Sequence, residues 1–240
     1  MARSNKKQSR LSRVINIEEA REVSRERKVK VQLIPRNTAQ EEYITYLNDP
    51  SRRIVFAIGP AGTGKTYLAV QKAISDLKEG KITRVVITRP AVSVEEKHGY
   101  LPGDLNKKME PWTRPIFDVF EEYYSPKDIR TMLEENVIEI APLAYMRGRT
   151  FKDCTIIFDE SQNTTPSQMK MALTRIGEGC RMFVTGDLRQ SDYKKENGLN
   201  SFFELLKTAK SEAIVSTYFK REHIERDPVV AEVLTYYGED

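Results

Sequence analysis

The eight-residue segment GPAGTGKT carries residue types that bind phosphate. It follows the apolar run 54–58 and leads into a helical pattern, the setting that gives a G-x-x-x-x-G-K-[ST] motif its meaning. Glycines let backbone N–H groups point inward at phosphate oxygens, and the helix offers its positive end to the same anion. Lys65 supplies charge for the β- and γ-phosphates, and the Thr66 hydroxyl can ligate Mg²⁺. The motif predicts a nucleoside triphosphate site at Gly59, Pro60, Ala61, Gly62, Thr63, Gly64, Lys65 and Thr66.

An acidic pair, Asp159–Glu160, directly follows the apolar run 154–158. A hydrophobic strand ending in two acids is typical of a Walker B element. Asp159 is expected to hold Mg²⁺, usually through water, and Glu160 to orient and deprotonate the attacking water. A small-molecule phosphotransferase is disfavoured, because Glu160 beside Asp159 suits water activation better than an acceptor site.

Two further predicted strands deliver polar residues to the same edge. Gln190 follows the strand 181–185, and its amide can sense a γ-phosphate or position water; a surface glutamine is the alternative. Arg89 follows the strand 82–88 and is a candidate for contact with phosphate or nucleic acid, with a structural salt bridge as its rival.

Strand and helix patterns alternate along the chain, and the strands are apolar enough to be buried on both faces. This predicts a doubly wound parallel α/β sheet with ligand sites beyond the carboxyl ends of the strands. The insertion 91–127 is rich in Pro, Gly and aromatic residues, including Tyr100, Trp112 and Phe117, which either stack on bases or pack in a core or an interface. The predicted strands are 29–34, 54–58, 82–88, 137–141, 154–158, 181–185 and 212–218, and the predicted helices are 15–28, a helix capped by Thr38 and running through Leu47, 66–78, 166–175, 199–209 and 228–237.

Composition places the 240-residue chain among soluble proteins, with 39% hydrophobic and 31% charged residues. No apolar run is long enough to span a membrane, and the N-terminus lacks the apolar core of a secretory signal. The two cysteines, Cys154 and Cys180, have no metal-binding spacing and are expected to be reduced. We therefore expect a cytoplasmic protein without a membrane partner, in the host cytoplasm if the source is viral.

Basic charge is concentrated in the first thirty residues, which hold ten Lys/Arg against four Asp/Glu, a net of +6. The remaining 210 residues hold twenty-nine against thirty-one, a net of −2. We expect residues 1–28 to form a partly disordered tail with a short helix, and residues 29–240 to form a single domain. The tail either makes nonspecific phosphate contacts or is a solvated terminus.

Motifs along the chain together resemble the PhoH-like ATPase family, which is similar to the core of superfamily 1 helicases. The resemblance implies a RecA-like P-loop NTPase core that binds ATP and Mg²⁺. The chain departs from the family pattern at Ser161, where Ala is usual, and at Asp227, where His is usual. It covers roughly Val31 to Asp192 and rests on PRNxxQ (35–40), GPAGTGKT, ITRPAV (87–92), GYLPGDL (99–105), IAPLAYMRGRTF (140–151), IIFDESQNTTPSQMKMALTRIG (156–177) and VTGDLRQSD (184–192).

The resemblance implies roles for three residues outside the phosphate loop. Gln40 resembles the glutamine that reads the adenine edge, with a helix-surface glutamine as the alternative. Gln190 resembles the glutamine that contacts the γ-phosphate. Arg226 is similar to the family's candidate arginine finger, which stabilises the charge of the transition state.

A nucleic-acid contact is implied for the segment around Gly148. Arg147 and Arg149 lie where the family resembles a helicase motif that contacts nucleic acid. Two arginines beside Tyr145 can hold a phosphate and stack on a base. A solvated loop is the alternative.

An incomplete nucleotide cleft is expected, because about fifty residues follow the phosphate-loop domain, too few for a second helicase lobe. A neighbouring subunit would then supply the missing wall, including the arginine. Head-to-tail contacts close into rings, so we expect a homo-oligomer, with a hexamer favoured by the resemblance. The first thirty residues are too short and basic for the nuclease domain of some relatives.

The sequence favours an ATPase that couples hydrolysis to RNA or single-stranded nucleic-acid binding, with helicase activity as an extension. The alternative is a nucleotide-gated regulatory protein whose slow hydrolysis acts as a switch.

Overall fold

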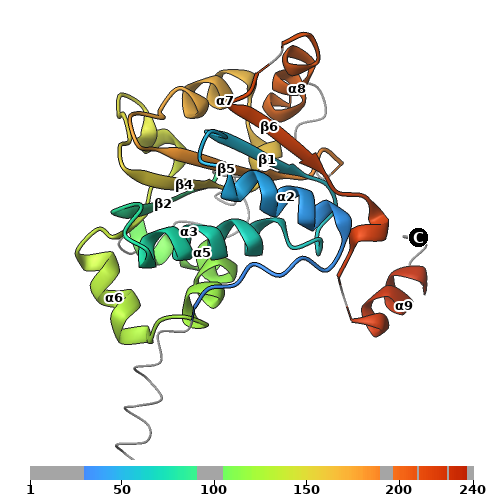
Figure 1. Cartoon of the computed structure of the whole chain (residues 1–240), viewed down its shortest axis with the longest axis horizontal. Coiled ribbons are helices and arrows are strands. Elements are labelled where there is room, and N and C mark those ends of the chain that lie inside the picture. Colours follow the sequence, from blue (N-terminus) through green and yellow to red (C-terminus); the bar gives the residue numbers. More distant parts are fainter. Residues whose placement is uncertain (1–29, 91–104, 190–196, 210, 226, 237–240) are drawn as a thin grey trace, which may run out of the picture. The chain divides into compact units, whose positions relative to one another are not determined.

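Six strands of mostly apolar residues form one sheet in the order β3-β2-β4-β5-β1-β6 (Figure 1). All neighbouring pairs are parallel. The computed structural model describes residues 30–90, 105–189, 197–209, 211–225 and 227–236. The strands are β1 (Ile54–Ile58), β2 (Arg84–Thr88), β3 (Ile138–Ile140), β4 (Cys154–Phe158), β5 (Arg181–Gly186) and β6 (Ile214–Tyr218).

Helices cover both faces of this sheet (Figure 1). One face packs against α2, α3 and α5, and the other against α7 and α8. This arrangement confirms the predicted doubly wound parallel α/β fold with a RecA-like core. The α-helices are α2 (Thr38–Asn48), α3 (Lys65–Lys78), α5 (Leu105–Glu121), α6 (Pro126–Glu134), α7 (Pro166–Leu173), α8 (Gly198–Thr208) and α9 (Pro228–Tyr236), and the 3₁₀ turns are η1 (Leu143–Met146), η2 (Ser161–Asn163) and η3 (Arg221–His223).

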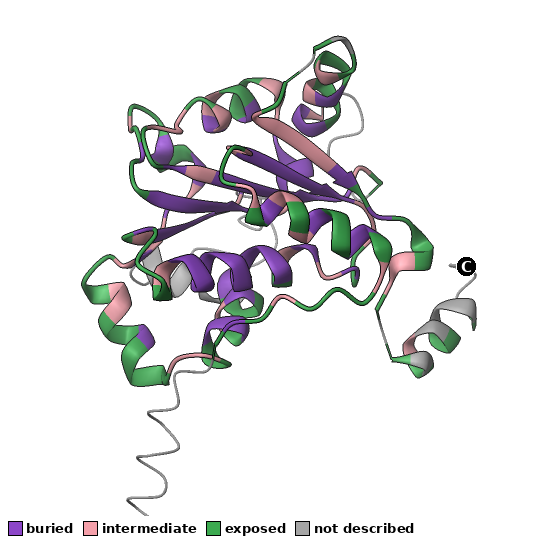
Figure 2. Cartoon of the chain, viewed as in Figure 1, coloured by how far each residue is buried: buried purple, intermediate pink, exposed green. Residues whose placement is uncertain are grey.

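Two hydrophobic clusters lie on opposite faces of the sheet, because successive strand residues point to opposite sides. In β1, Val55 and Ala57 join the cluster beneath α2 and α3, whereas Phe56 joins the cluster beneath α7 and α8. Both β1 and β4 are buried along their whole length (Figure 2). Burial on both faces is why these strands appear in the sequence as uninterrupted apolar runs.

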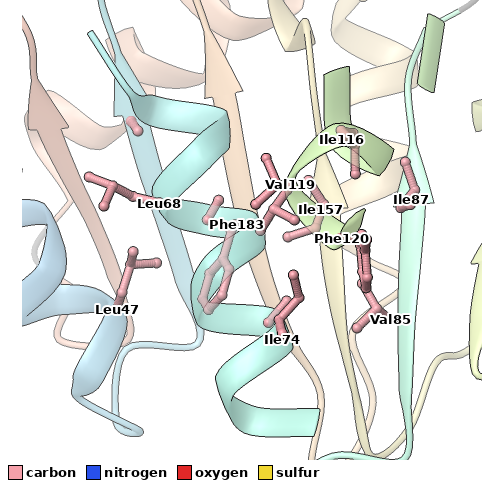
Figure 3. Close-up of a cluster of buried hydrophobic side chains, with 14 of the residues drawn as sticks. Leu47, Leu68, Ile74, Val85, Ile87, Ile116, Val119, Phe120, Ile157 and Phe183 are labelled. Carbon is pink, nitrogen blue, oxygen red and sulfur yellow. The ribbon is translucent and has the colours of Figure 1, made fainter. Parts of the chain in front are cut away.

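The described part of the predicted insertion is helical and belongs to the core. Ile116, Val119 and Phe120 of α5 lie in the cluster with Ile157 of β4 (Figure 3). Phe117 is partly buried against the same cluster and Trp112 is half-buried, which favours packing over base stacking for these two aromatics. Tyr100 lies outside the described residues.

The predicted strand 29–34 is wrong over its described part, which forms no strand. Val31 is buried and Leu33 packs against the core, whereas Ile34 is 67% exposed. The alternation therefore reflects an extended segment with one buried side and no strand partner. The cap of α2 also differs from the prediction, because the side chain of Asn37, rather than that of Thr38, accepts the hydrogen bond from the Gln40 N–H.

Replacement of Phe120 tests whether α5 is part of the core. Phe120→Ala removes a fully buried ring, so we expect the free energy of unfolding to fall by about 3–5 kcal/mol. Phe117→Ala, the same change at a half-buried position of the same helix, should lower the free energy of unfolding by clearly less. Urea denaturation measures both variants, and equal losses would contradict the packing of α5.

Candidate nucleotide-binding site

The phosphate loop connects β1 to α3 and depends on its glycines. Gly59 and Gly64 have φ angles of 147° and 81°, which L side chains rarely adopt. A Cβ on Gly59 would lie 2.2 Å from the carbonyl oxygen of Phe219, so the residue directly after β6 lies too close to the loop for any side chain. This turn brings the chain to Lys65, the first residue of α3.

Lys65 is nearly buried and lies over the loop that precedes it. Its Nζ donates to the carbonyl oxygen of Pro60 at 2.6 Å and to Thr63 Oγ1 at 3.3 Å. The ammonium group is thus held inside the curl of the loop, where a bound phosphate would face it.

Asp159, at the end of β4, joins three elements through one oxygen. Its Oδ1 accepts hydrogen bonds from Thr66 Oγ1 at 2.9 Å and from Thr185 Oγ1 at 2.5 Å. The two predicted Mg²⁺ ligands, Thr66 and Asp159, therefore lie within hydrogen-bond distance of each other. One carboxylate and hydroxyl oxygens, with the remaining positions left to water and phosphate, are the donor set that suits Mg²⁺.

Glu160 has a backbone conformation unusual for its residue type, with φ 52° and ψ 38°. Non-glycine residues in this left-handed region are uncommon and mark a local constraint. Its Oε2 accepts a hydrogen bond from Gln162 Nε2 at 2.5 Å, and its Oε1 lies 3.9 Å from Arg89 Nη2. The carboxylate is therefore held by two partners.

These groups line a cavity of about 210 Å³ at the carboxyl ends of β1, β4 and β5. Pairing is in register at this edge, where Ile58 lies opposite Gly186 and Phe158 opposite Val184. The segments predicted from sequence to meet there do meet. The lining residues are Ala61, Gly62, Gly64, Lys65, Thr66, Tyr67, Asp159, Glu160, Thr185, Gly186 and Asp187.

Tyr67 is the one aromatic side chain among the described residues that line this cavity. Its hydroxyl donates to Glu122 Oε2 at 3.0 Å and accepts from Gln71 Nε2 at 2.9 Å. Burial and the hydrogen bond to the Glu122 carboxylate raise the pKa of Tyr67 to about 12. The phenol is therefore neutral at physiological pH and adds no negative charge to the cavity.

Gln40 of α2 is buried, so the alternative of a helix-surface glutamine is excluded. Its Nε2 donates to the carbonyl oxygen of Thr63 at 3.1 Å, and its Oε1 accepts from the Arg36 N–H at 2.9 Å. An amide has two donors and two acceptor lone pairs, so one of each is left beyond these two hydrogen bonds. Gln40 is thus placed against the phosphate loop.

Arg89 forms a salt bridge, the alternative to a ligand-binding role that the sequence left open: its Nη2 lies 3.9 Å from Glu160 Oε1. Its Nη1 donates to the carbonyl oxygen of Trp112 at 3.4 Å. Arg89 thus connects the end of β2 to the acidic pair and to α5.

The other three nucleic-acid candidates, Tyr145, Arg147 and Arg149, differ from one another. Arg149 is engaged by Glu139, with Nη1 2.5 Å from Oε1, and lies 4.4 Å from the centre of the Phe151 ring. The hydrogen bond to Glu139 raises the pKa of Arg149. Tyr145, 62% exposed, and Arg147, also exposed, lie beyond the carboxyl end of β3. Arg149 is therefore built into the fold, whereas the other two face solvent.

Two predicted catalytic residues, Gln190 and Arg226, lie outside the described residues. The described chain comes close to the site shortly before each of them. Asp187 lines the cavity, and the Glu225 N–H donates to the carbonyl oxygen of Gly62 at 2.9 Å.

Sequence reasoning missed Gln162, Ser161 and Thr185. The Gln162 side chain bridges Glu160 and the Asp187 N–H, and Ser161 Oγ donates to the carbonyl oxygen of Thr185 at 2.8 Å. The available signal was a run of four polar residues, 161–164, directly after the acidic pair. All four are buried, which an ordinary loop does not require.

The parallel sheet, the phosphate loop and the acidic pair one strand away define the class of P-loop NTPase folds. The chain belongs to the PhoH-like protein family, whose model matches residues 32–238. None of the described helices is long and apolar enough to cross a membrane.

Curated relatives share this region. The chain is 46% identical over 202 residues to a PhoH-like protein of Bacillus subtilis, covering 82% of this chain and 61% of the relative. It is 36% identical over 210 residues to Protein PhoH of Escherichia coli, covering 86% and 58%. The chain thus spans about three fifths of the length of these relatives.

A more distant likeness is to a solved chain described as a Sulfolobus solfataricus SWI2/SNF2 ATPase core in complex with dsDNA. It has a TM-score of 0.42 and 15% identity, and covers 66% of this chain and 33% of that one. A likeness at this level carries no argument about function.

Replacement of Gly59 tests the close approach of β6 to the phosphate loop. Gly80→Ala is unfavourable only because of the positive φ at this position, since no atom lies within 4 Å of the new Cβ. Gly59→Ala also has a positive φ, and its new Cβ clashes with the Phe219 backbone. We expect Gly59→Ala to lose about 1–3 kcal/mol more stability than Gly80→Ala, as in overpacked sites. Thermal unfolding measures both, and equal losses would contradict the contact.

Proposed function

We propose that this protein binds Mg-ATP and hydrolyses it. The observation that carries the proposal is the cavity in which Lys65 and Thr66, at the start of α3, meet Asp159 and Glu160, which directly follow β4. A lysine, a metal-binding hydroxyl–carboxylate pair and a second carboxylate are the parts that phosphoryl transfer to water requires.

Each residue then has a distinct task. The loop N–H groups and Lys65 bind the phosphates and offset the charge that develops on them. Thr66 and Asp159 would hold Mg²⁺, which supplies charge neutralisation when bound. Glu160 orients a water molecule and accepts its proton. Gln40 contacts the adenine, since its position against Thr63 leaves amide capacity for a base.

Two residues outside the described part complete the proposed site. Gln190 contacts the γ-phosphate, and Arg226 acts as an arginine finger. In our proposal the arginine reaches the nucleotide of a neighbouring subunit in a hexameric ring. A cavity bounded by one chain at a single sheet edge is compatible with such a shared site.

The proposal also couples hydrolysis to the binding of RNA or single-stranded nucleic acid, with unwinding as an extension of this coupling. The support is the pair Tyr145 and Arg147, which are exposed beyond the end of β3 at the same sheet edge as the cavity. An exposed aromatic ring beside a cation suits base stacking and phosphate contact. Arg149 acts here as support for that turn.

A nucleotide-gated regulatory protein is the second candidate. It shares the ATP site but needs no response to polymer. ATPase rates with and without single-stranded RNA or DNA separate the two, because a motor is stimulated and a simple switch is not.

Two substitutions test the ATP site. Lys65→Ala removes the charge that faces the phosphates, so we expect ATP binding to weaken strongly. Glu160→Gln keeps shape and hydrogen bonding but cannot accept a proton, so ATP should bind while hydrolysis falls by about 10²–10⁴-fold. Equilibrium binding and phosphate release measure the two effects. Wild-type hydrolysis by the Glu160 variant would remove that residue from the base role.

A further substitution tests the nucleic-acid surface. Tyr145→Ala removes the proposed stacking platform, so we expect binding of single-stranded RNA or DNA to weaken by about 1–3 kcal/mol. Arg130→Ala is the control, because Arg130 is exposed on α6, which leads into the opposite end of β3. Fluorescence anisotropy with a labelled oligonucleotide measures both. Equal binding by the Tyr145 variant and the wild type would exclude this surface.

A further inference from the structure

The carboxylate of Glu160 is held by groups from two different elements. Gln162 Nε2 donates to its Oε2 at 2.5 Å, and Arg89 Nη2 lies 3.9 Å from its Oε1. The left-handed backbone at Glu160 turns the chain between β4 and η2, so that Gln162 can reach back to it two residues later. Both oxygens of the carboxylate therefore have a partner.

The orientation of the Gln162 amide follows from its two contacts. The Asp187 N–H can only donate, so it must meet Oε1, which it does at 3.0 Å. The Glu160 carboxylate can only accept when ionised, so it must meet Nε2. Because Gln162 is 1% exposed, water does not compete for either contact. One side chain thus connects the end of β4 to the end of β5.

Space for this bridge is provided by Gly186. A Cβ there would lie 3.0 Å from Gln162 Oε1 and 2.8 Å from Ser161 Oγ. The bare backbone at the end of β5 lets the amide come close enough to bind the next N–H. The bridge is therefore built from residues on both strands.

We propose that Gln162 is a positioning residue for Glu160: its amide holds the carboxylate in the orientation that accepts a proton from water and ties it to the backbone after β5. This inference rests on the proposed ATPase function. A shift of the segment that begins at Asp187 moves the Gln162 amide and with it the general base. Hydrolysis is then sensitive to whatever displaces that segment.

Glutamine suits this position because its amide oxygen accepts the hydrogen bond from the Asp187 N–H while its amide nitrogen donates to the Glu160 carboxylate. Glutamate has the same size and can accept from the Asp187 N–H, but it places a second carboxylate against Glu160. Like charges at this distance repel each other, so the Glu160 carboxylate loses the hydrogen bond that holds it and is pushed away. Among the described residues, the other charged groups around Glu160 are Arg89 directly after β2, Lys65 on α3, Asp159 directly after β4 and Asp187 after β5.

The test is the split between kcat and KM in Gln162→Glu, measured by phosphate release. Repulsion turns the Glu160 carboxylate away from the orientation in which it accepts a proton, whereas the phosphate loop and the Thr66–Asp159 pair keep their contacts. We expect kcat to fall about tenfold or more with KM retained. Mg-ATP binding, measured separately, should change much less than kcat.

Gln168→Glu is the matched control. Gln168 is exposed in the capping box of α7, a position that glutamate also fills, so the kcat and KM of this variant should be those of the wild type. If Gln162→Glu does not fold, Gln162→Asn decides: it keeps the amide but is too short to bridge, so kcat should fall about tenfold with KM retained.

The outcomes separate the inference from the function on which it rests. A wild-type kcat for Gln162→Glu or for Gln162→Asn overturns the positioning role alone. A wild-type protein that hydrolyses no ATP overturns the proposed function instead.

Discussion

The carboxylate of Asp159 accepts hydrogen bonds from hydroxyls of two other elements, Thr66 at the start of α3 and Thr185 near the end of β5. This junction fixes the phosphate-loop helix to the acidic pair across the sheet. In the sheet, β5 lies between β4, which leads to Asp159, and β1, which leads to the phosphate loop. A contact between the loop helix and the acidic pair therefore has to span β5. A parallel sheet in register brings these ends to one edge, and the shared oxygen determines how they meet. Both the cavity and the proposed metal site follow from that contact.

The same edge is held from both sides by close backbone approach. Gly59 allows β6 to pack against the loop, and Gly186 allows the turn after β4 to pack against β5. In each place a side chain would separate two elements that share the site. Arg89 and Gln162 then connect the acidic pair to β2 and to the segment after β5. The charged groups are therefore positioned by neighbours rather than by their own strands alone.

Much of the fold was accessible from sequence, because strands buried on both faces appear as continuous apolar runs; 54–58 and 154–158 were predicted with the observed bounds. The helix α5 was not, since Pro111 and Pro115 mark a helix interior as a loop. The strand predicted at 29–34 was wrong over its described part. Alternating apolar residues there indicate that one side of the segment is buried, but not that the segment pairs with another strand. In the site, the motifs predicted which segments meet. The bridge at Gln162 could not be predicted, because it depends on the space left by Gly186 across the sheet.

In the proposed site, the junction at Asp159 makes the metal and the nucleotide bind together. The most direct test is equilibrium binding of ATP to the wild-type chain, measured once with Mg²⁺ and once with Mg²⁺ chelated. The Thr66 hydroxyl and the Asp159 carboxylate would contribute to ATP affinity through the ion, so we expect saturable binding that weakens by at least about tenfold on chelation, a change of about 1.4 kcal/mol. Absence of ATP binding, or equal affinity in both conditions, would contradict a Mg-ATP site at this edge of the sheet.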